Sequence, residues 1–355
     1  MKKFVVKIIT FFLALLLTCA GLVYFIDPYN VFHPFNIRDN GVEPNKNYIK
    51  MKYILANPGK FDALLFGSSR VGTIHTDTIE GEHCYNMTYS KGLPCEHLAN
   101  LKTLVNSESK PSKVYIGLDS QSYTTNPRPH NNDQQRSPYE YYISNPKDFW
   151  SLYINPTEAV ESLFSVTLAS SRSTADVFVD AFYSGGWFMD YGQDGQENLD
   201  DVWPSIGFTS YIEEVLDTIR QIAELCEENG IELVVFINPM QRNTYSAAIE
   251  MGHFDFMLGL ADIVPYYNFS GYNDVTVNPR NYEDTSHYIA EVGDLLLDCM
   301  CRDRVDAGLA EQGFGMLVTC ENVTEYVEFL ETQAIEYEST WDTRLTIADV
   351  KALMG

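Results

Sequence analysis

Three short apolar segments, separated by helical patterns, most constrain the fold of this chain. Residues 61–66 (FDALLF), 113–119 (KVYIGLD) and 231–237 (IELVVFI) are apolar runs rather than alternations of apolar and polar residues. Strands of this kind are typically buried on both faces of a mostly parallel sheet. Residues 209–228 form an amphipathic helical pattern that ends at an Asn-Gly pair, a common helix terminator. The alternation predicts an α/β domain, a three-layer sandwich around a mostly parallel sheet.

Shorter patterns predict the remaining elements of this domain. They are a weaker strand at 84–87, helices at 93–105 and 240–260, a strand at 263–267 and a last helix at 287–300. Residues 123–142 are rich in Pro, Asn and Gln and predict a loop. Residues 145–205 interrupt the alternation and indicate an insertion of two helices and an irregular stretch rich in Gly and Asp. Residues 323–337 predict a helical arm, for which the sequence indicates no packing partner.

The N-terminal segment has the composition of a membrane-spanning helix. An uncharged apolar run at 8–26 follows three lysines, and a spanning helix needs about 20 such residues. The lysines place the N-terminus in the cytoplasm, so the chain after Asp27 is expected outside it. A cleaved signal peptide is the alternative, but the run continues through bulky residues to Asp27 and offers a poor cleavage site. Cys19 only faintly resembles a lipoprotein cysteine, because the large Thr18 precedes it.

These patterns divide the chain into three segments. An N-terminal membrane anchor or signal sequence occupies 1–30, and a C-terminal helical extension occupies 304–355. The α/β domain lies between them at 31–303 and carries the insertion at about 145–205.

The composition limits the partners and cofactors of the chain. Its net charge of −25 argues against nucleic acid and an acidic lipid surface as partners, because like charges repel. Seven cysteines permit disulfides outside the cytoplasm, but their spacing does not reveal the pairing. Cys299 and Cys301 have no accompanying histidine pair at ligand spacing, so we assign no metal and no other cofactor.

The run at 61–66 leads directly into Gly67-Ser68-Ser69-Arg70. Ligands of open parallel sheets bind beyond the carboxyl ends of the strands, so a serine hydroxyl on this turn faces the expected cleft. The amide of Ser69, near a helix start, can donate to an oxyanion. The alternative is that Ser68 or Ser69 simply caps the following helix.

A second candidate unit precedes the last predicted helix. Asp284 and His287 are three positions apart, which suits an imidazole base that is oriented by a carboxylate. Alternatively, Asp284 is a helix N-cap and His287 an ordinary surface histidine.

A nucleophilic serine after the first strand, followed by acid and base before the final helix, resembles the chain order of the SGNH (GDSL-type) hydrolases. The resemblance extends over about 61–300. It implies that Ser69 is the nucleophile, with His287 as base and Asp284 as the acid that orients it. The anchor and the Gly-Ser-Ser form are similar to a membrane-anchored branch with teichoic-acid D-alanyl transfer proteins and polysaccharide O-acetylation proteins.

The middle blocks of the family are less well matched. Residues 86–92 (NMTYSKG) resemble the second block and make Gly92, together with the Ser69 amide, a candidate for the oxyanion hole. The third block places Asp119 where the family has an asparagine, and an ionised carboxylate would repel an oxyanion. Asp119 is then protonated or points elsewhere, or Asn86 supplies the donor.

The resemblance implies an extracytoplasmic serine esterase or O-acyltransferase that acts on acyl esters of a cell-envelope glycan. A small ester is an alternative substrate, and a membrane-bound acyltransferase is an expected partner. The other hypothesis is a catalytically inactive SGNH-like domain that binds envelope polymer or scaffolds such an acyltransferase. The candidate substrate-binding residues are Arg70, Asp119, Asn238 and Arg242, although a structural ion pair is the preferred interpretation of Arg70.

Overall fold

The computed structural model describes residues 2–38, 42–155, 181–187 and 210–339, together with positions 157, 160, 163 and 164. These residues form a mixed α/β fold around a six-stranded sheet of order β2-β1-β3-β4-β5-β6. The first five strands in the chain pair in parallel and the sixth pairs antiparallel to β5. The strands are β1 (Ala63–Phe66), β2 (Cys84–Asn86), β3 (Lys113–Leu118), β4 (Glu232–Ile237), β5 (Tyr266–Asn268) and β6 (Met316–Val318).

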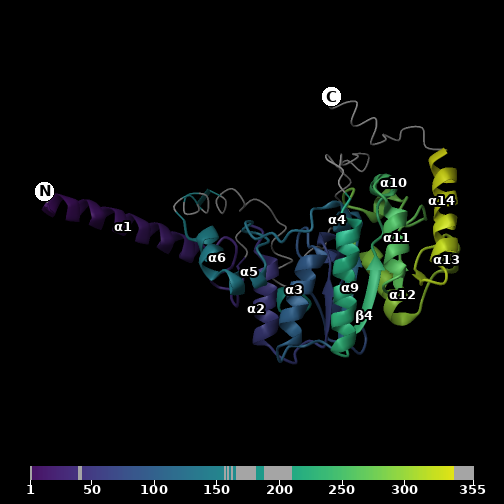
Figure 1. Cartoon of the computed structure of the whole chain (residues 1–355), viewed down its shortest axis with the longest axis horizontal. Coiled ribbons are helices and arrows are strands. Elements are labelled where there is room, and N and C mark those ends of the chain that lie inside the picture. Colours follow the sequence, from purple (N-terminus) through teal and green to yellow (C-terminus); the bar gives the residue numbers. More distant parts are fainter. Residues whose placement is uncertain are drawn as a thin grey trace.

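The described helices lie mostly between these strands in the chain (Figure 1). The α-helices are α1 (Lys2–Ile26), α2 (Lys46–Ala56), α3 (Pro94–Val105), α4 (Ser120–Thr124), α5 (Tyr139–Ser144), α6 (Pro146–Tyr153), α9 (Ile212–Glu228), α10 (Arg242–Glu250), α11 (His253–Ala261), α12 (Ala290–Arg302), α13 (Ala307–Glu311) and α14 (Val323–Ser339). Short 3₁₀ helices are η1 (Ser69–Thr73), η2 (Thr76–Thr78) and η3 (Pro279–Asn281).

Both faces of the sheet are buried, and successive strand residues alternate between them. In β1, Leu64 and Phe66 pack into a core with α2, α3 and α9, while Ala63 and Leu65 join a second core with α12. Because side chains alternate along a strand, a continuous apolar run supplies both cores at once. The predicted mostly parallel sheet is confirmed.

Helix α2 and strand β6 are among the elements that have no counterpart among the predictions. Helix α2 is buried along most of its length although Lys46, Asn47 and Lys50 interrupt its apolar pattern. Strand β6 is only three residues long, and its Met316 and Leu317 are exposed. Neither segment shows the regular apolar period on which a sequence-based prediction depends.

Several predicted boundaries shift. Helix α12 begins at Ala290 rather than at residue 287, because an antiparallel bridge between Tyr282 and Tyr288 holds the preceding residues in a turn. Helices α4 and α5 narrow the loop predicted at 123–142 to residues 125–138. Of the insertion predicted at 145–205, α6 is described, and most of the remainder lies outside the described residues.

The chain after α12 returns to the same sheet. Strand β6 pairs with β5, so that Val318 lies opposite Tyr266. Helix α14, which covers the arm predicted at 323–337, packs against α11 and buries Leu330 in the main core.

Helix α1 projects from the body of the molecule (Figure 1). It is 25 residues long, and Val23 is its buried residue. By length and composition it can cross a membrane, a test that a signal sequence would also pass.

Candidate active site

Ser69 is the first residue of η1, directly after the Gly67-Ser68 turn that follows β1. A Cβ on Gly67 would come within 2.6 Å of Val71 Cγ2, so the turn requires glycine there. Ser68 is the N-cap of η1, and its Oγ accepts a hydrogen bond from the Arg70 amide at 3.3 Å. The capping function that the sequence left open between the two serines therefore belongs to Ser68, and Ser69 Oγ makes a different contact.

Asp284 and His287 form a compact turn before α12. The Oδ1 atom of Asp284 accepts the amides of Ser286 at 2.6 Å and of His287 at 2.8 Å. Its Oδ2 atom lies 2.7 Å from His287 Nδ1. Asp284 thus caps its own turn and contacts the imidazole at the same time, which combines the two interpretations considered for it.

The structure brings Ser69, His287 and Asp284 into one hydrogen-bonded chain. His287 Nε2 lies 2.9 Å from Ser69 Oγ, across 218 residues of sequence. Since the carboxylate of Asp284 can only accept, we assign the ring proton to Nδ1, which leaves the Nε2 lone pair directed at the Ser69 hydroxyl. This arrangement can deprotonate the hydroxyl as it attacks a carbonyl carbon.

The electrostatics favour an ionised Asp284. Burial by itself would raise the pKa of this carboxyl group, but the hydrogen bond and charge of His287 and the two backbone amides hold the pKa below its ordinary value. Its side chain keeps 48% of its surface exposed, so part of this effect is screened by water. An ionised Asp284 is the form that stabilises an imidazolium.

Asp119 does not face the nucleophile as an unpaired carboxylate. Its Oδ1 lies 2.6 Å from Arg70 Nη1 and accepts the Gln121 amide at 2.8 Å, and its Oδ2 accepts the Ser68 hydroxyl at 2.6 Å. The side chains of Arg70 and Asp119 are 4% and 0% exposed. The structural ion pair preferred for Arg70 is therefore confirmed. The substrate-binding role considered for Asp119 is corrected, because its buried carboxylate is paired with Arg70 and also caps α4.

Arg70 also connects the two halves of the triad. Its Nε donates to the carbonyl oxygen of Ser286 at 3.2 Å, across 216 residues. One guanidinium thus contacts both the Asp119 carboxylate, to which the nucleophile turn is hydrogen-bonded, and the turn that carries His287.

Asn86 is corrected in the same way as an oxyanion donor. Its Nδ2 donates to the carbonyl oxygens of Val71 at 2.8 Å and of Ile74 at 3.2 Å, and its Oδ1 accepts the Thr88 amide. The side chain is fully buried and holds η1 against the end of β2. It has no donor left for a substrate.

Gly92 supports the nucleophile turn by close packing. Its amide donates to the Tyr89 carbonyl oxygen at 3.2 Å, within its own turn, so the oxyanion-donor role expected for Gly92 is corrected. A Cβ at this position would collide with the carbonyl of Gly67. The Ser69 amide has no hydrogen-bond acceptor among the described residues, and it is therefore the oxyanion donor that this site offers.

Asn238 and Arg242, which follow β4, have different surroundings. Asn238 is buried, donates to the Leu118 carbonyl at 3.1 Å and accepts the Tyr288 hydroxyl at 2.9 Å. It tethers the residue after His287 and is corrected from a substrate-binding to a structural role. Arg242 is the first residue of α10, at the carboxyl edge of the sheet, and is half-buried, so it remains a candidate for substrate binding.

Two residues that support the site were not identified from the sequence. The Thr88 hydroxyl lies 3.0 Å from the Gly67 carbonyl and also contacts the Ser68 carbonyl. The Thr244 hydroxyl donates to the Thr285 carbonyl at 2.5 Å and joins α10 to the turn that carries His287. A single threonine beside a motif has no spacing signal, so only the assembled fold reveals these contacts.

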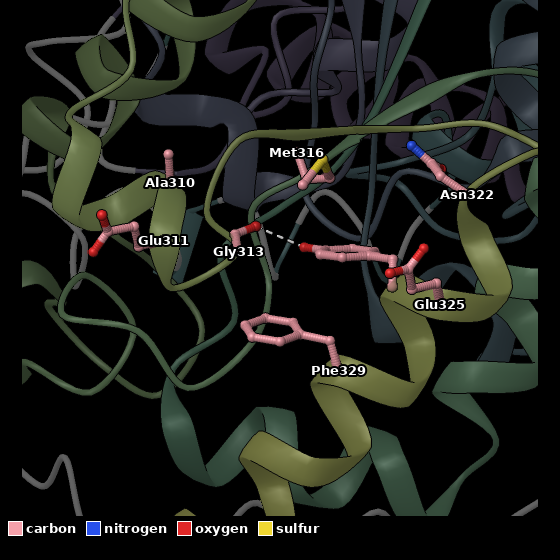
Figure 2. Close-up of a pocket in the computed structure, with 8 residues that line it drawn as sticks. Ala310, Glu311, Gly313, Met316, Asn322, Glu325 and Phe329 are labelled. Atoms are coloured by element: carbon pink, nitrogen blue, oxygen red, sulfur yellow. Dashed lines mark hydrogen bonds between the residues drawn. The ribbon is translucent and has the colours of Figure 1, made fainter.

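A separate hollow of about 350 Å³ lies between α13 and the start of α14 (Figure 2). Tyr326 and Phe329 give it aromatic walls, Glu311 and Glu325 line it, and the Tyr326 hydroxyl donates to the Gly313 carbonyl at 2.6 Å. None of the triad residues lines this hollow. Among the described residues no group of three or more His, Cys, Asp or Glu side chains is arranged to hold a metal ion.

A scan against protein-family models finds no match to this chain, and a search of the curated proteins finds no matching relative. Any assignment of function therefore depends on the geometry of the site itself.

Proposed function

We propose that this chain is a serine esterase or O-acyltransferase of SGNH type, with the described α/β fold arranged as a three-layer sandwich. One observation carries the proposal: the hydrogen-bonded chain Ser69–His287–Asp284 at the carboxyl edge of a parallel sheet. Nucleophile, base and orienting acid then have the geometry that acyl transfer requires.

The proposed reaction passes through an acyl-serine. His287 Nε2 takes the proton of Ser69 Oγ as that oxygen bonds to the carbonyl carbon of the ester, and the carbonyl oxygen becomes an oxyanion. The Ser69 amide donates to the oxyanion, an interaction worth roughly 3 kcal/mol. The C–O bond to the alcohol then breaks and His287 returns the proton to the leaving alkoxide. Water or a second hydroxyl then attacks the acyl carbon while His287 takes its proton. The bond from the acyl carbon to Ser69 Oγ breaks, and His287 returns the proton to Ser69 Oγ.

The proposed setting is the outer face of a membrane. Helix α1 would be a single-pass anchor, with the lysines at its start in the cytoplasm and the domain on the other side. The proposed substrate is an acyl ester of a cell-envelope glycan, with a membrane-bound acyltransferase as partner. Arg242, half-buried at the carboxyl edge of the sheet, is the proposed contact for an anionic group of that substrate.

A second candidate function is an inactive SGNH-like domain that binds envelope polymer or scaffolds an acyltransferase. The observation in its favour is the oxyanion hole: both Asn86 and Asp119 are committed to structural hydrogen bonds. Removing one oxyanion donor commonly costs about 10²–10³ in rate, so a hole with few donors favours slow or absent chemistry.

The decisive experiment is active-site labelling of the full chain in detergent with a fluorophosphonate probe. We expect one adduct on Ser69 in the wild-type protein and none in Ser69→Ala, because the Ser69 hydroxyl contacts His287, which Asp284 orients. Ser68→Ala is the matched control, since Ser68 contacts Asp119 and not His287. Its adduct should form more slowly but on the same residue, as located by mass spectrometry.

Two results would count against the proposal in different ways. Labelling that persists in Ser69→Ala would refute the nucleophile. A folded wild-type protein that neither labels nor turns over an aryl acetate would favour the inactive domain.

A further inference from the structure

Exposed apolar side chains gather in the segments around the base of α1. Outside α1, half of the large hydrophobic residues exposed on the described surface belong to residues 31–38 and 139–164. They are Phe35, Ile143, Ile154, Val160, Leu163 and Phe164. Single exposed apolar residues are normal on a protein surface, but a concentration of them marks an interaction surface.

The end of α1 is packed against this region rather than loosely tethered to it. Tyr24 near the end of α1 contacts the Phe32 ring at 5.6 Å between centroids, and Phe32 stacks on Trp150 of α6 at 5.3 Å. Arg38 Nη1 donates to the Phe25 carbonyl at 2.9 Å and so closes the C-terminal end of the helix. The Phe32 ring therefore lies between the end of α1 and helix α6, where α1 meets the rest of the molecule (Figure 1).

The buried carboxylate of Asp27 stabilises the segment that joins α1 to the rest of the domain. Asp27 directly follows α1 in a left-handed conformation, and its carboxylate accepts the amides of Val31, Phe32 and His33. It also contacts His33 Nδ1 at 3.0 Å. The connection therefore holds the domain at a defined distance from the end of α1.

Three of the exposed residues beyond α6 lie on one helical face. Val160, Leu163 and Phe164 are helical, their spacing of three and four positions places them side by side, and Phe164 is 64% exposed. Such an apolar face has the composition of a helix that lies in the interface of a bilayer. The net charge of −25 gives no attraction to anionic lipid, so apolar burial would have to drive such a contact.

We propose that the exposed side chains of Phe35, Ile143, Ile154, Val160, Leu163 and Phe164 form a membrane-interface surface that places the domain on the outer leaflet of the bilayer in which α1 is anchored. This surface would contact the bilayer where the headgroups meet the acyl chains, because it continues from the base of the spanning helix. The inference rests on the anchoring part of the proposed function and is independent of the catalytic part.

The test uses the full chain in nanodiscs of phosphatidylcholine whose acyl chain carries a photoreactive diazirine. After irradiation and trypsin digestion, mass spectrometry locates the lipid adducts. The peptide 148–172 holds Ile154, Val160, Leu163 and Phe164. The peptide 305–344 is a matched control, since it holds the exposed Val305, Met316, Leu317, Phe329 and Ile335.

We expect adducts on α1 and on peptide 148–172, with at least a tenfold lower yield on peptide 305–344. The double variant Leu163→Glu/Phe164→Glu should lower the yield on 148–172 several-fold and leave the adducts on α1 unchanged. Adducts on α1 alone, or equal yields on both peptides, would overturn the surface while leaving the anchor intact. Absence of adducts on α1 would overturn the anchor and the surface together. If residue 164 instead cross-links in cells to another membrane protein and not to lipid, the surface binds a protein and the proposed bilayer contact is wrong.

Discussion

At the residue scale, the three residues that follow Gly67 each make a different contact. Ser69 contacts the base, Ser68 caps the helix and bonds Asp119, and Arg70 pairs with Asp119 and with the Ser286 carbonyl. The carboxylate of Asp119, which the sequence predicts to repel an oxyanion if ionised, instead forms a buried ion pair with Arg70. Since each partner of such a pair is costly to leave alone, the two should act as one unit.

The first residue-scale prediction concerns Arg70 as a positioning residue. Arg70→Met should slow fluorophosphonate labelling by roughly 10–100-fold, because displacement of a catalytic group by about 1 Å can cost that much. Arg70→Lys should recover only part of the rate, since one ammonium cannot reproduce the planar contacts of guanidinium to Asp119 and Ser286. The measurement is the second-order rate constant for labelling.

The control is Arg220→Met, which breaks the exposed pair of Arg220 with Asp217 on α9. It should label at the wild-type rate. Wild-type labelling of a folded Arg70→Met protein would show that the buried pair does not position the triad.

At the element scale, α2 holds together segments that the sheet alone does not. The Nζ atom of its buried Lys50 donates to the carbonyls of Asn86 at 2.8 Å, Thr88 at 2.7 Å and Gly186 at 2.6 Å. Burial lowers the pKa of this ammonium group well below its ordinary value. Helix α2 thereby fixes the segment whose Thr88 supports the nucleophile turn.

We therefore expect Lys50→Met to lower the free energy of unfolding by about 3 kcal/mol or more, since each buried carbonyl left without a donor costs roughly 1–3 kcal/mol. Urea denaturation followed by circular dichroism measures the change. Lys102→Met, at an exposed position of α3, should stay within about 0.5 kcal/mol of the wild type. Equal effects of the two substitutions would remove the structural role assigned to Lys50.

At the scale of the whole molecule, the C-terminal segment belongs to the same core as the sheet that carries the candidate site. Strand β6 extends the sheet beside β5, and α14 buries Leu330 against the cluster that also contains β3 and β4 residues. A segment that shares its core with the sheet should unfold together with it.

Leu330→Ala should consequently lower the free energy of unfolding of the whole described domain by about 2–5 kcal/mol, the usual cost of a buried leucine cavity. The far-ultraviolet signal and the loss of fluorophosphonate labelling should shift to the same lower urea concentration. Ile335→Ala, on the same helix but 72% exposed, is the matched control and should change little. Separate transitions for the two signals would instead indicate an independent C-terminal unit.

The amino-acid sequence by itself determined the features that depend on local pattern. Buried apolar runs predicted the strands of the parallel sheet, and helical spacing predicted α3, α9 and α12. The order of Ser69, Asp284 and His287 along the chain marked the candidate site. The strand and helix signals each lie within one short segment, where periodicity and turn chemistry act. The order of the three site residues joins segments 218 residues apart, and its weight came from the resemblance to a known family.

Only the tertiary structure decided which polar groups meet. Ser68 and Asp119 are 51 residues apart and Arg70 and Ser286 are 216 residues apart, so their contacts exist only once the strands are assembled side by side. The same assembly assigned Asn86 and Asn238 to structural hydrogen bonds and added α2 and β6 to the fold. A buried polar group forms hydrogen bonds with the partners that the fold brings near it, and no local period in the sequence indicates which partners these are.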